Sequence, residues 1–280
     1  MEQQNKNNKY ILDSHCHIYP EKIAARAVEA IGAFYDLHME QDGTVGDLID
    51  AGSRCGITHF LVHSVSTTPH QVKSINDFIS SEVKKHPERL VGFGTLHPDS
   101  EDIEGDVEYL LNLGLHGVKL HPDFQKFAID SPRSVEMCRL FAGKVPLLMH
   151  AGDPRYDYSN PDNILRFLDK VPDITLIAAH FGGWNNWREA LSKLTGIDNL
   201  YVDCSSSFYN MTKEEAAGAI EAFGADHVLF GSDYPMWSPG GELNILESLG
   251  LTPKQLRMIE WENGARLLNL ETDTEEKEKD

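Results

Sequence analysis

Two histidines one residue apart, in the segment ILDSHCHIYP at residues 11–20, are side chains that could bind a metal. His15 and His17 end a short apolar run, and side chains on a strand alternate between its two faces. Both imidazoles therefore point to one side of the strand, with Cys16 on the other. Such a pair can supply two ligands to a divalent metal, and a catalytic site needs a third protein ligand and an open position.

Three more polar residues end apolar runs later in the chain. His150 ends VPLLMH, His180 ends ITLIAAH and Asp233 ends HVLFGSD. A carboxylate placed after such a run should be buried, which is costly unless the carboxylate is paired or bound to a cation. Taken singly, His150 could be a core histidine and Asp233 a helix N-cap. Taken with the His-x-His pair, the three residues predict a metal site assembled from several strand ends.

The elements that must position these residues follow a repeating pattern. Apolar or β-branched runs lie at residues 10–17, 58–65, 89–97, 117–121, 145–150, 174–180, 199–206 and 227–233. Segments with apolar residues at helical spacing lie at 70–86, 102–114, 131–143, 160–171, 212–224 and 252–270. Alternation of this kind predicts βα units with a parallel sheet.

The spacing of the predicted strand ends selects the architecture. Neighbouring ends are about 24 to 34 residues apart, except for a first gap of about 46, and a βα unit needs roughly 30 residues. This favours an α/β fold with a closed (β/α)₈ TIM barrel, in a single domain over residues 10–270, rather than a doubly wound open sheet. Residues 1–9 are predicted to be a disordered lead, and residues 271–280 an acidic, solvated, disordered tail.

The long first gap leaves a segment at residues 34–47 that could form a loop or short helix over the barrel mouth. A substrate-covering role and a plain surface insertion both fit this segment. In such a barrel the active site lies at the C-terminal ends of the strands, which is where the polar residues fall.

Composition and charge exclude several classes of function. The net charge of −19 would repel nucleic acid and anionic membrane surfaces, and no apolar run approaches the roughly 18 residues of a membrane helix. The polar start lacks a secretory signal pattern, which predicts a cytoplasmic protein. The cysteines are far apart, which favours core thiols over disulfides or a zinc finger. Assembly into a homo-oligomer is left open.

The ordered set of the first-strand His-x-His, the later histidines and GSDYP resembles the amidohydrolase superfamily across nearly the whole chain. DSHCH, GVKLHP, AAHFGG and GSDYP are most similar to its amidohydrolase-2 branch, which includes aminocarboxymuconate semialdehyde decarboxylase, related aromatic-acid decarboxylases, and lactone or C–C hydrolases. The resemblance implies a (β/α)₈ fold and a divalent metal, most often zinc, with manganese as an alternative.

The resemblance also implies roles for individual residues. It makes His15, His17, His150 and Asp233 the metal ligands, with His180 beside the metal as an acid–base or orienting residue. Two-metal members of the superfamily use a carboxylated lysine on the fourth strand, where this chain has Lys119. That lysine could instead bind a substrate carboxylate as an ammonium group.

Two reactions fit this set. In hydrolysis, Asp233 would take a proton from a metal-activated water and pass it to the leaving group, while His180 and the metal stabilise the oxyanion. In decarboxylation, the metal would orient substrate oxygens or activate water, and His180 or Asp233 would protonate the substrate carbon. We expect hydrolysis of a small carboxylate- or carbonyl-containing substrate, with decarboxylation of a small aromatic or unsaturated acid as the alternative.

Residues of the substrate pocket are predicted from their places near strand ends. We expect substrate contacts from Lys119, His121, Arg155 and Trp237. His63 and His97 are expected behind the site or in the core.

Two other classes remain less favoured. A metal-dependent deoxyribonuclease would share the His-x-His start, but its usual mid-chain glutamate ligand is replaced here by GVKLHP, and the charge is unsuited to DNA. A barrel that binds a metal or small ligand without turnover has no evident reason to bury five polar residues.

Overall fold

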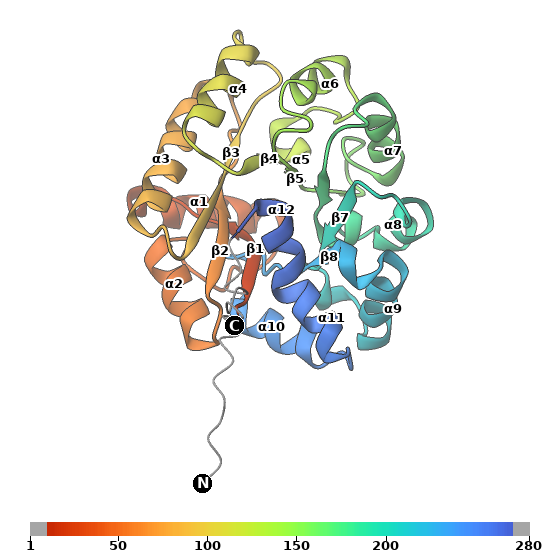
Figure 1. Cartoon of the computed structure of the whole chain (residues 1–280). Helices are drawn as coiled ribbons and strands as arrows, with labels where there is room; N and C mark the ends of the chain where they lie inside the picture. Colours follow the sequence, from red (N-terminus) through yellow and green to blue (C-terminus); the bar gives the residue numbers. More distant parts are fainter. Residues whose placement is uncertain (1–9, 271–280) are drawn as a thin grey trace, which may run out of the picture.

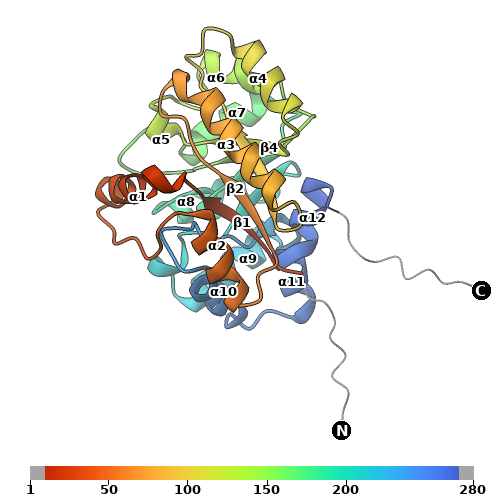
Figure 2. The same cartoon turned by 90° about the vertical axis from the view of Figure 1, so that its left-hand side faces the viewer.

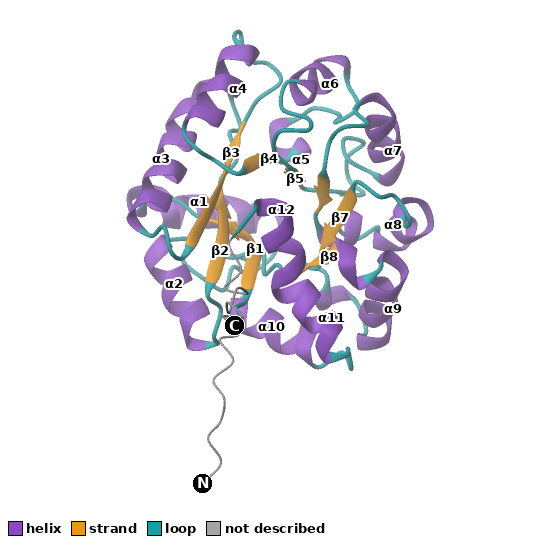
Figure 3. Ribbon diagram, viewed as in Figure 1, coloured by secondary structure: helices purple, strands orange, loops and turns teal. Residues whose placement is uncertain are grey.

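The computed structural model describes residues 10–270, which form a barrel of eight parallel strands surrounded by helices (Figures 1 and 3). Each strand pairs with the next in chain order. The strands are β1 (Leu12–His17), β2 (His59–His63), β3 (Leu90–Thr95), β4 (Gly117–Leu120), β5 (Leu147–Met149), β6 (Leu176–Ala178), β7 (Leu200–Asp203) and β8 (Val228–Leu229). The predicted (β/α)₈ architecture in a single domain is confirmed.

The barrel closes between β1 and the segment that follows β8. The backbone N–H of Ser14 donates to the carbonyl of Phe230 at 2.8 Å, and that of His17 donates to Tyr234 at 2.7 Å. Cys16 and Tyr234 form a parallel bridge. The first and last βα units are therefore joined beside the predicted metal site.

Helices cover the outside of the barrel. They are α1 (Glu21–Tyr35), α2 (Val45–Arg54), α3 (Val72–Lys85), α4 (Ile103–Asn112), α5 (Pro122–Gln125), α6 (Pro132–Arg139), α7 (Pro161–Lys170), α8 (Trp187–Leu194), α9 (Lys213–Phe223), α10 (Pro239–Glu247), α11 (Pro253–Arg257) and α12 (Asn263–Leu268). A single π-helical segment at Met258–Glu262 joins α11 to α12. Between residues 10 and 270, no helix is long and apolar enough to cross a bilayer.

The six predicted helical segments and eight predicted strands all occur, but the strands are shorter than predicted. β5 ends at Met149 and β8 at Leu229, so His150 and Asp233 lie on the loops that follow rather than on the strands. Helices α1, α2, α5, α8 and α10 are additional to the six predicted segments. The segment at 34–47 holds the end of α1, a loop and the start of α2. Residues 1–9 and 271–280, predicted to be disordered, lie outside the described residues.

Apolar side chains fill the inside of the barrel toward the N-terminal ends of the strands, whereas the C-terminal end is polar. The inner core includes Leu12, Phe93, Leu148 and Ile177, and it is closed at the bottom by Trp261. A second, larger core lies between the strands and the helices. Cys16 belongs to this outer core, as the alternation of strand side chains predicts. All four cysteines are free thiols, and three of them are buried.

A close backbone approach holds together the loops that follow β5 and β6. Gly152 has a φ of +71°, and a Cβ atom at this position would lie 2.5 Å from the Cα of Gly183 and would also meet the side chain of Asn186. Trp184 donates its backbone N–H to Ala151 at 2.7 Å in the same contact. The approach fixes the segments that carry His150 and His180.

We predict that Gly152→Ala lowers the free energy of unfolding by roughly 2 to 3 kcal/mol, because it adds a steric clash to the cost of a positive φ. Gly143→Ala is the matched control, since Gly143 has a φ of +73° and open space around it. The free energy of unfolding of this control should fall by only about 1 kcal/mol. Urea unfolding of both variants measures the difference, and equal losses would show that the close approach contributes nothing.

Candidate active site

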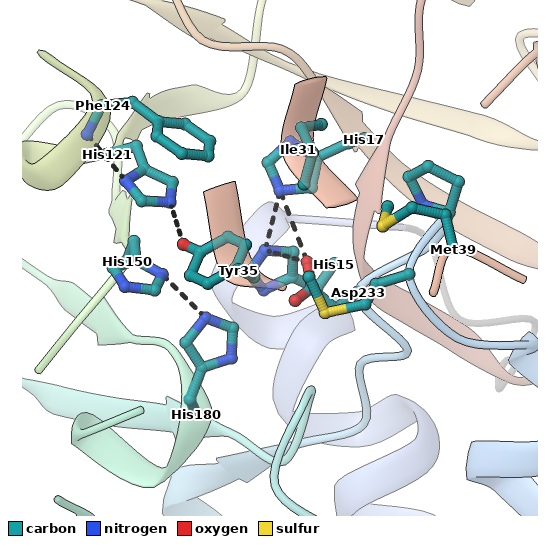
Figure 4. A pocket seen from close by; sticks show the side chains of 12 residues that line it. His15, His17, Ile31, Tyr35, Met39, His121, Phe124, His150, His180 and Asp233 are labelled. Carbon is teal, nitrogen blue, oxygen red and sulfur yellow. Dashed lines mark hydrogen bonds and ion pairs between the residues drawn. The ribbon is translucent and has the colours of Figure 1, made fainter. Parts of the chain in front are cut away.

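A small pocket at the C-terminal end of the barrel gathers the predicted residues (Figure 4). The polar side chains that line it come from loops and strand ends on opposite sides of the barrel, and α1 and its following loop cover them. The lining consists of His15, His17, Ile31, Tyr35, Met39, His121, Phe124, His150, His180, Asp233, Pro235 and Met236. The structure thus brings together all five residues predicted as metal ligands or acid–base groups.

His15, His17 and Asp233 form one side of the pocket. The Nε2 atoms of the two histidines are 3.3 Å apart, and the Asp233 Oδ1 atom lies 3.3 Å from His15 Nε2 and 3.5 Å from His17 Nε2. Two tetrahedral ligand atoms at 2.0–2.1 Å from one zinc ion would be separated by about 3.3 to 3.4 Å. The three donor atoms therefore have the mutual spacing of ligands that share one ion.

His150 and His180 form the opposite side. His180 Nδ1 lies 2.8 Å from the backbone carbonyl of Ser205, which can only accept, so the proton of a neutral His180 is on Nδ1 and Nε2 carries a lone pair. His180 Nε2 faces His150 Nδ1 at 3.0 Å. The other nitrogen of His150, Nε2, faces the Asp123 carboxylate at 3.2 Å.

These contacts create an electrostatic conflict that a cation would relieve. His150 Nε2 and both Asp123 oxygens are buried without a hydrogen-bond partner in the described part of the chain, although they lie 3.2 Å apart. If the proton of His150 is on Nε2, toward this carboxylate, two lone pairs face each other across 3.0 Å between His150 and His180. A proton or a metal ion must then lie near these nitrogens. The nitrogen and oxygen donors of this pocket suit a divalent transition metal.

Three aspartates that sequence reasoning missed orient these residues. Asp203 accepts from His15 Nδ1 at 2.8 Å and from the backbone N–H of His180 at 3.1 Å. Asp123 faces His150. Asp13 accepts from the backbone N–H of Ser232 at 2.9 Å, beside Asp233. Carboxylates of this kind fix the tautomer and direction of metal-ligating histidines.

The burial of these groups shifts their pKa values in opposite directions. Burial lowers the pKa of His17 to about 4 and that of His180 to about 3. Burial alone would raise the pKa values of Asp203 and Asp233, but His15 and the neighbouring histidines hold both below the usual 3.8. The pocket therefore favours ionised carboxylates and neutral imidazoles, the forms that bind metals.

Lys119 lies beneath the histidines rather than in the pocket lining. Its side chain is fully buried, and Nζ is 3.0 Å from His15 Nε2. Burial lowers its pKa from 10.5 to about 8, although Asp233 and Asp203 partly oppose this. Among the described residues that line the pocket there is no arginine or lysine. Lys119 thus contacts a predicted ligand, and its contact with substrate stays a prediction.

His121 lies in the pocket wall as predicted, with an unpredicted partner from α1. Its ring stacks on Phe124 at 3.8 Å and on His150 at 4.0 Å between centroids. The hydroxyl of Tyr35 is 2.8 Å from His121 Nε2. Burial, with His150 beside it, lowers the pKa of His121 well below 6.5. His121 Nδ1 accepts from the backbone N–H of Phe124 at 3.3 Å, so a neutral His121 carries its proton on Nε2 and donates it to the Tyr35 oxygen. The end of α1 therefore lies over the site.

Arg155 and Trp237 lie outside the pocket lining, because other residues hold their polar groups. Arg155 makes a bidentate ion pair with Asp153, with contacts of 2.7 to 3.1 Å, and donates to the carbonyl of Phe34 at 2.8 Å. It connects the loop after β5 to the end of α1. Trp237 donates Nε1 to Ser206 Oγ at 2.8 Å, and Ser206 donates to Asp233 at 2.5 Å. Direct substrate contacts by Arg155 and Trp237 stay predictions.

The two remaining strand-end histidines are buried, as expected. The His63 ring lies 4.4 Å from that of His17 and 5.0 Å from that of His15, and neither of its nitrogens has a hydrogen-bond partner. His97 accepts from the backbone N–H of Asp99 at 3.1 Å and lies outside the pocket lining.

Fold and site together define a (β/α)₈ barrel enzyme with its chemistry at the C-terminal mouth. A family model described as amidohydrolase (Amidohydro_2) matches residues 12–270, and the chain therefore belongs to the amidohydrolase-2 family. Members of this family are metal-dependent enzymes, and the resemblance drawn from the sequence is confirmed. A search of curated proteins found no match.

Solved structures share the fold over nearly the whole chain. An uncharacterised TIM-barrel protein from Bordetella bronchiseptica is 21% identical, with 93% of this chain and 98% of that chain covered and a TM-score of 0.78. A dihydroxybenzoic acid decarboxylase from Polaromonas with bound manganese is 17% identical (94% and 97% covered, TM-score 0.73). A putative 2-pyrone-4,6-dicarboxylic acid hydrolase from Pseudomonas putida is 18% identical (94% and 98%, TM-score 0.65).

We predict that Asp203→Asn weakens metal binding by about 10- to 100-fold, because the carboxylate that orients His15 is lost. The measurement is zinc affinity by competition with a chromogenic chelator. Asp226→Asn, at an exposed aspartate on the protein surface, is the control and should bind zinc normally. Unchanged affinity in a folded Asp203→Asn variant would show that Asp203 does not support a metal site.

We also predict that the metal-free protein loses stability in acid, and that His63→Leu reduces this loss. Burial lowers the pKa of His63 well below 6.5 in the folded state. The unfolded chain therefore binds one more proton below about pH 6.5, and unfolding becomes easier as the pH falls toward the folded value.

Each extra proton bound by the unfolded chain lowers the free energy of unfolding by about 1.4 kcal/mol for every pH unit of acidification. Unfolding in urea between pH 4.5 and 7.5 should show a shallower acid slope in His63→Leu than in the parent. The control His70→Leu removes an exposed histidine and should keep the parent slope. An equal slope in all three proteins would contradict the prediction.

Proposed function

We propose that this chain is a metal-dependent hydrolase of a small carbonyl- or carboxylate-containing compound. Its metal would be one divalent cation, most readily zinc, held by His15, His17, His150 and Asp233. The observation that supports this is the spacing of His15 Nε2, His17 Nε2 and Asp233 Oδ1, 3.3 to 3.5 Å apart in a pocket that His150 also lines. Imidazole and carboxylate ligands suit zinc and also accommodate manganese.

A bound divalent cation would supply Lewis-acid chemistry, lowering the pKa of a water molecule and polarising a carbonyl oxygen. The chain's own residues then handle the protons. Asp233 can accept a proton through its carboxylate, whose Oδ1 atom faces the two histidines and whose Oδ2 atom accepts from Ser206. A carboxylate fixed in this way can pass that proton to a leaving group.

His180 has a narrower role than the sequence suggested. Because Ser205 fixes the proton of neutral His180 on Nδ1, its Nε2 atom presents a lone pair to the pocket. A neutral His180 can accept a proton or bind a second cation, but it cannot donate a hydrogen bond from Nε2 to an oxyanion. We therefore propose that His180 is a base beside the metal. Lys119 Nζ lies 3.0 Å from His15 Nε2, so a carboxylated Lys119 with a second metal is the alternative to its role as an ammonium group.

Decarboxylation is the second candidate, because several proteins of similar structure are decarboxylases. These neighbours include 2,6-dihydroxybenzoate and 5-carboxyvanillate decarboxylases. In this pocket the substrate carboxylate would have to be bound chiefly by the metal, because no arginine or lysine of the described chain lines the wall. Protonation of the substrate carbon would then fall to His180 or Asp233.

We predict that the purified protein carries about one divalent ion per chain and that its hydrolysis of a simple lactone stops on chelation and returns with Zn²⁺ or Mn²⁺. His15→Ala should lose the ion. Asp233→Asn should lower kcat by about 10²- to 10⁴-fold through loss of the base, whereas the surface variant Asp226→Asn should not.

Elemental analysis and parallel assays of δ-valerolactone and 2,6-dihydroxybenzoate decide among the candidates. Carbon dioxide release from the acid, with no lactone turnover, would select the decarboxylase. About two ions per chain would select the two-metal site. Protein that takes up no metal after reconstitution would contradict the proposal.

A further inference from the structure

A second, much larger cavity adjoins the active-site pocket. It has a volume of about 860 Å³, against about 20 Å³ for the pocket itself, and it runs between α1 and α3. His17, Ile31 and Phe124 line both cavities. Figure 4 shows Ile31 beside His17, and Figure 2 shows α1 at the left of the molecule, away from the strands, with α3 to its right. We call this second cavity the α1–α3 groove.

The α1 wall of the groove is an apolar helix face that is exposed at Ile23, whereas its C-terminal end packs through Phe34 against Phe124. Ile23, Ala27, Ile31 and Phe34 recur at intervals of three and four residues and all line the groove. Ala24 is the single buried residue of α1. The side chain of Ile23 is 44% exposed. A face of this kind is normally covered, so α1 is placed to contact an apolar occupant.

The remaining walls are also uncharged, apart from the rim. Ile75 and Phe78 of α3 face α1 across the groove, and the loop after β2 contributes Ser64 and Val65. The charged lining residues are Lys22, which is exposed, and Asp77, which accepts a hydrogen bond from the Tyr109 hydroxyl. An ionic group inside the groove would therefore lose water without gaining a partner.

Size and continuity identify the occupant as part of the substrate. Cavities that hold drug-sized ligands measure roughly 300 to 1,000 Å³ and are mostly apolar with a few polar groups at one end. The α1–α3 groove has this size, and its polar end is His17, a predicted metal ligand. A single aromatic ring would fill only a small part of it.

We propose that the substrate carries a metal-binding oxygen group at one end and an uncharged apolar body, longer than one ring, at the other. The body lies in the α1–α3 groove between Ala27 and Ile75, and the head group reaches the pocket past His17 and Ile31. The identity of the head group rests on the proposed function, whereas the place of the body rests on the groove alone.

The test measures binding of straight-chain carboxylates, from butanoate through hexanoate and octanoate to decanoate, by titration calorimetry on the zinc-loaded and the metal-free protein. Each added methylene that enters the groove should strengthen binding by about two- to fourfold. Ala27→Trp would fill the groove and should abolish this gain while leaving butanoate binding unchanged. Ala25→Trp is the matched control, because Ala25 is exposed on α1 outside the groove lining and should keep the gain.

Three results would overturn the proposal: affinity that does not rise with chain length, a gain that Ala27→Trp retains, or a gain that Ala25→Trp abolishes equally. Sedimentation of the parent and of Ala27→Trp tests the rival occupant. A dimer that dissociates in Ala27→Trp, with no alkanoate binding, would assign the groove to a second copy of the chain.

The same titrations separate this inference from the proposed function. If zinc strengthens none of the carboxylates but the gain with chain length persists, the metal-binding head group fails and the groove assignment is supported. If zinc strengthens all four compounds equally and chain length has no effect, the metal site is supported and the groove assignment is overturned.

Discussion

Buried imidazoles and a carboxylate are crowded at the C-terminal end of the barrel, and the fold is built to hold them there. His15, His17 and Asp233 meet on one side of the pocket, and His150 and His180 meet on the other, all at 3.0 to 3.5 Å. Bare lone pairs at these distances repel, and a dry interior strengthens the repulsion. Lys119 Nζ, 3.0 Å from His15 Nε2, offsets part of this repulsion, and the fold must hold the remaining groups in place.

The barrel supplies that rigidity through hydrogen bonds behind the site. Asp203 holds His15 and the backbone of His180 at once, so the first and sixth units cannot move independently. Asp13 holds the loop before Asp233, and Gly152 allows the loops after β5 and β6 to pack backbone against backbone. Preorganised ligands lower the cost of binding an ion, because little has to be ordered when it arrives.

Much of this could be predicted from the sequence, because a parallel barrel places every strand end at one mouth. His15, His17, His150, His180 and Asp233 were found for that reason. Asp203 gave the same signal, an aspartate at the end of the apolar run NLYVD, and could have been found. Arg155 could not be placed, because its partner Asp153 and its contact with Phe34 depend on how a loop folds. Tyr35 was not predicted because α1 was not predicted. The apolar face of α1 lines the groove and is not buried in the core.

The division between barrel and first helix also explains how one metal site could serve a particular substrate. In (β/α)₈ enzymes the strands supply the reactive groups, and the loops decide what reaches them. This chain places its longest connection after β1, and the connection forms α1, which covers the pocket through Tyr35 and walls the groove through Ile31. A change to α1 could therefore alter which molecules bind without touching the predicted metal ligands. In the proposed substrate, the head group and the body would be selected by different elements, which meet at His17.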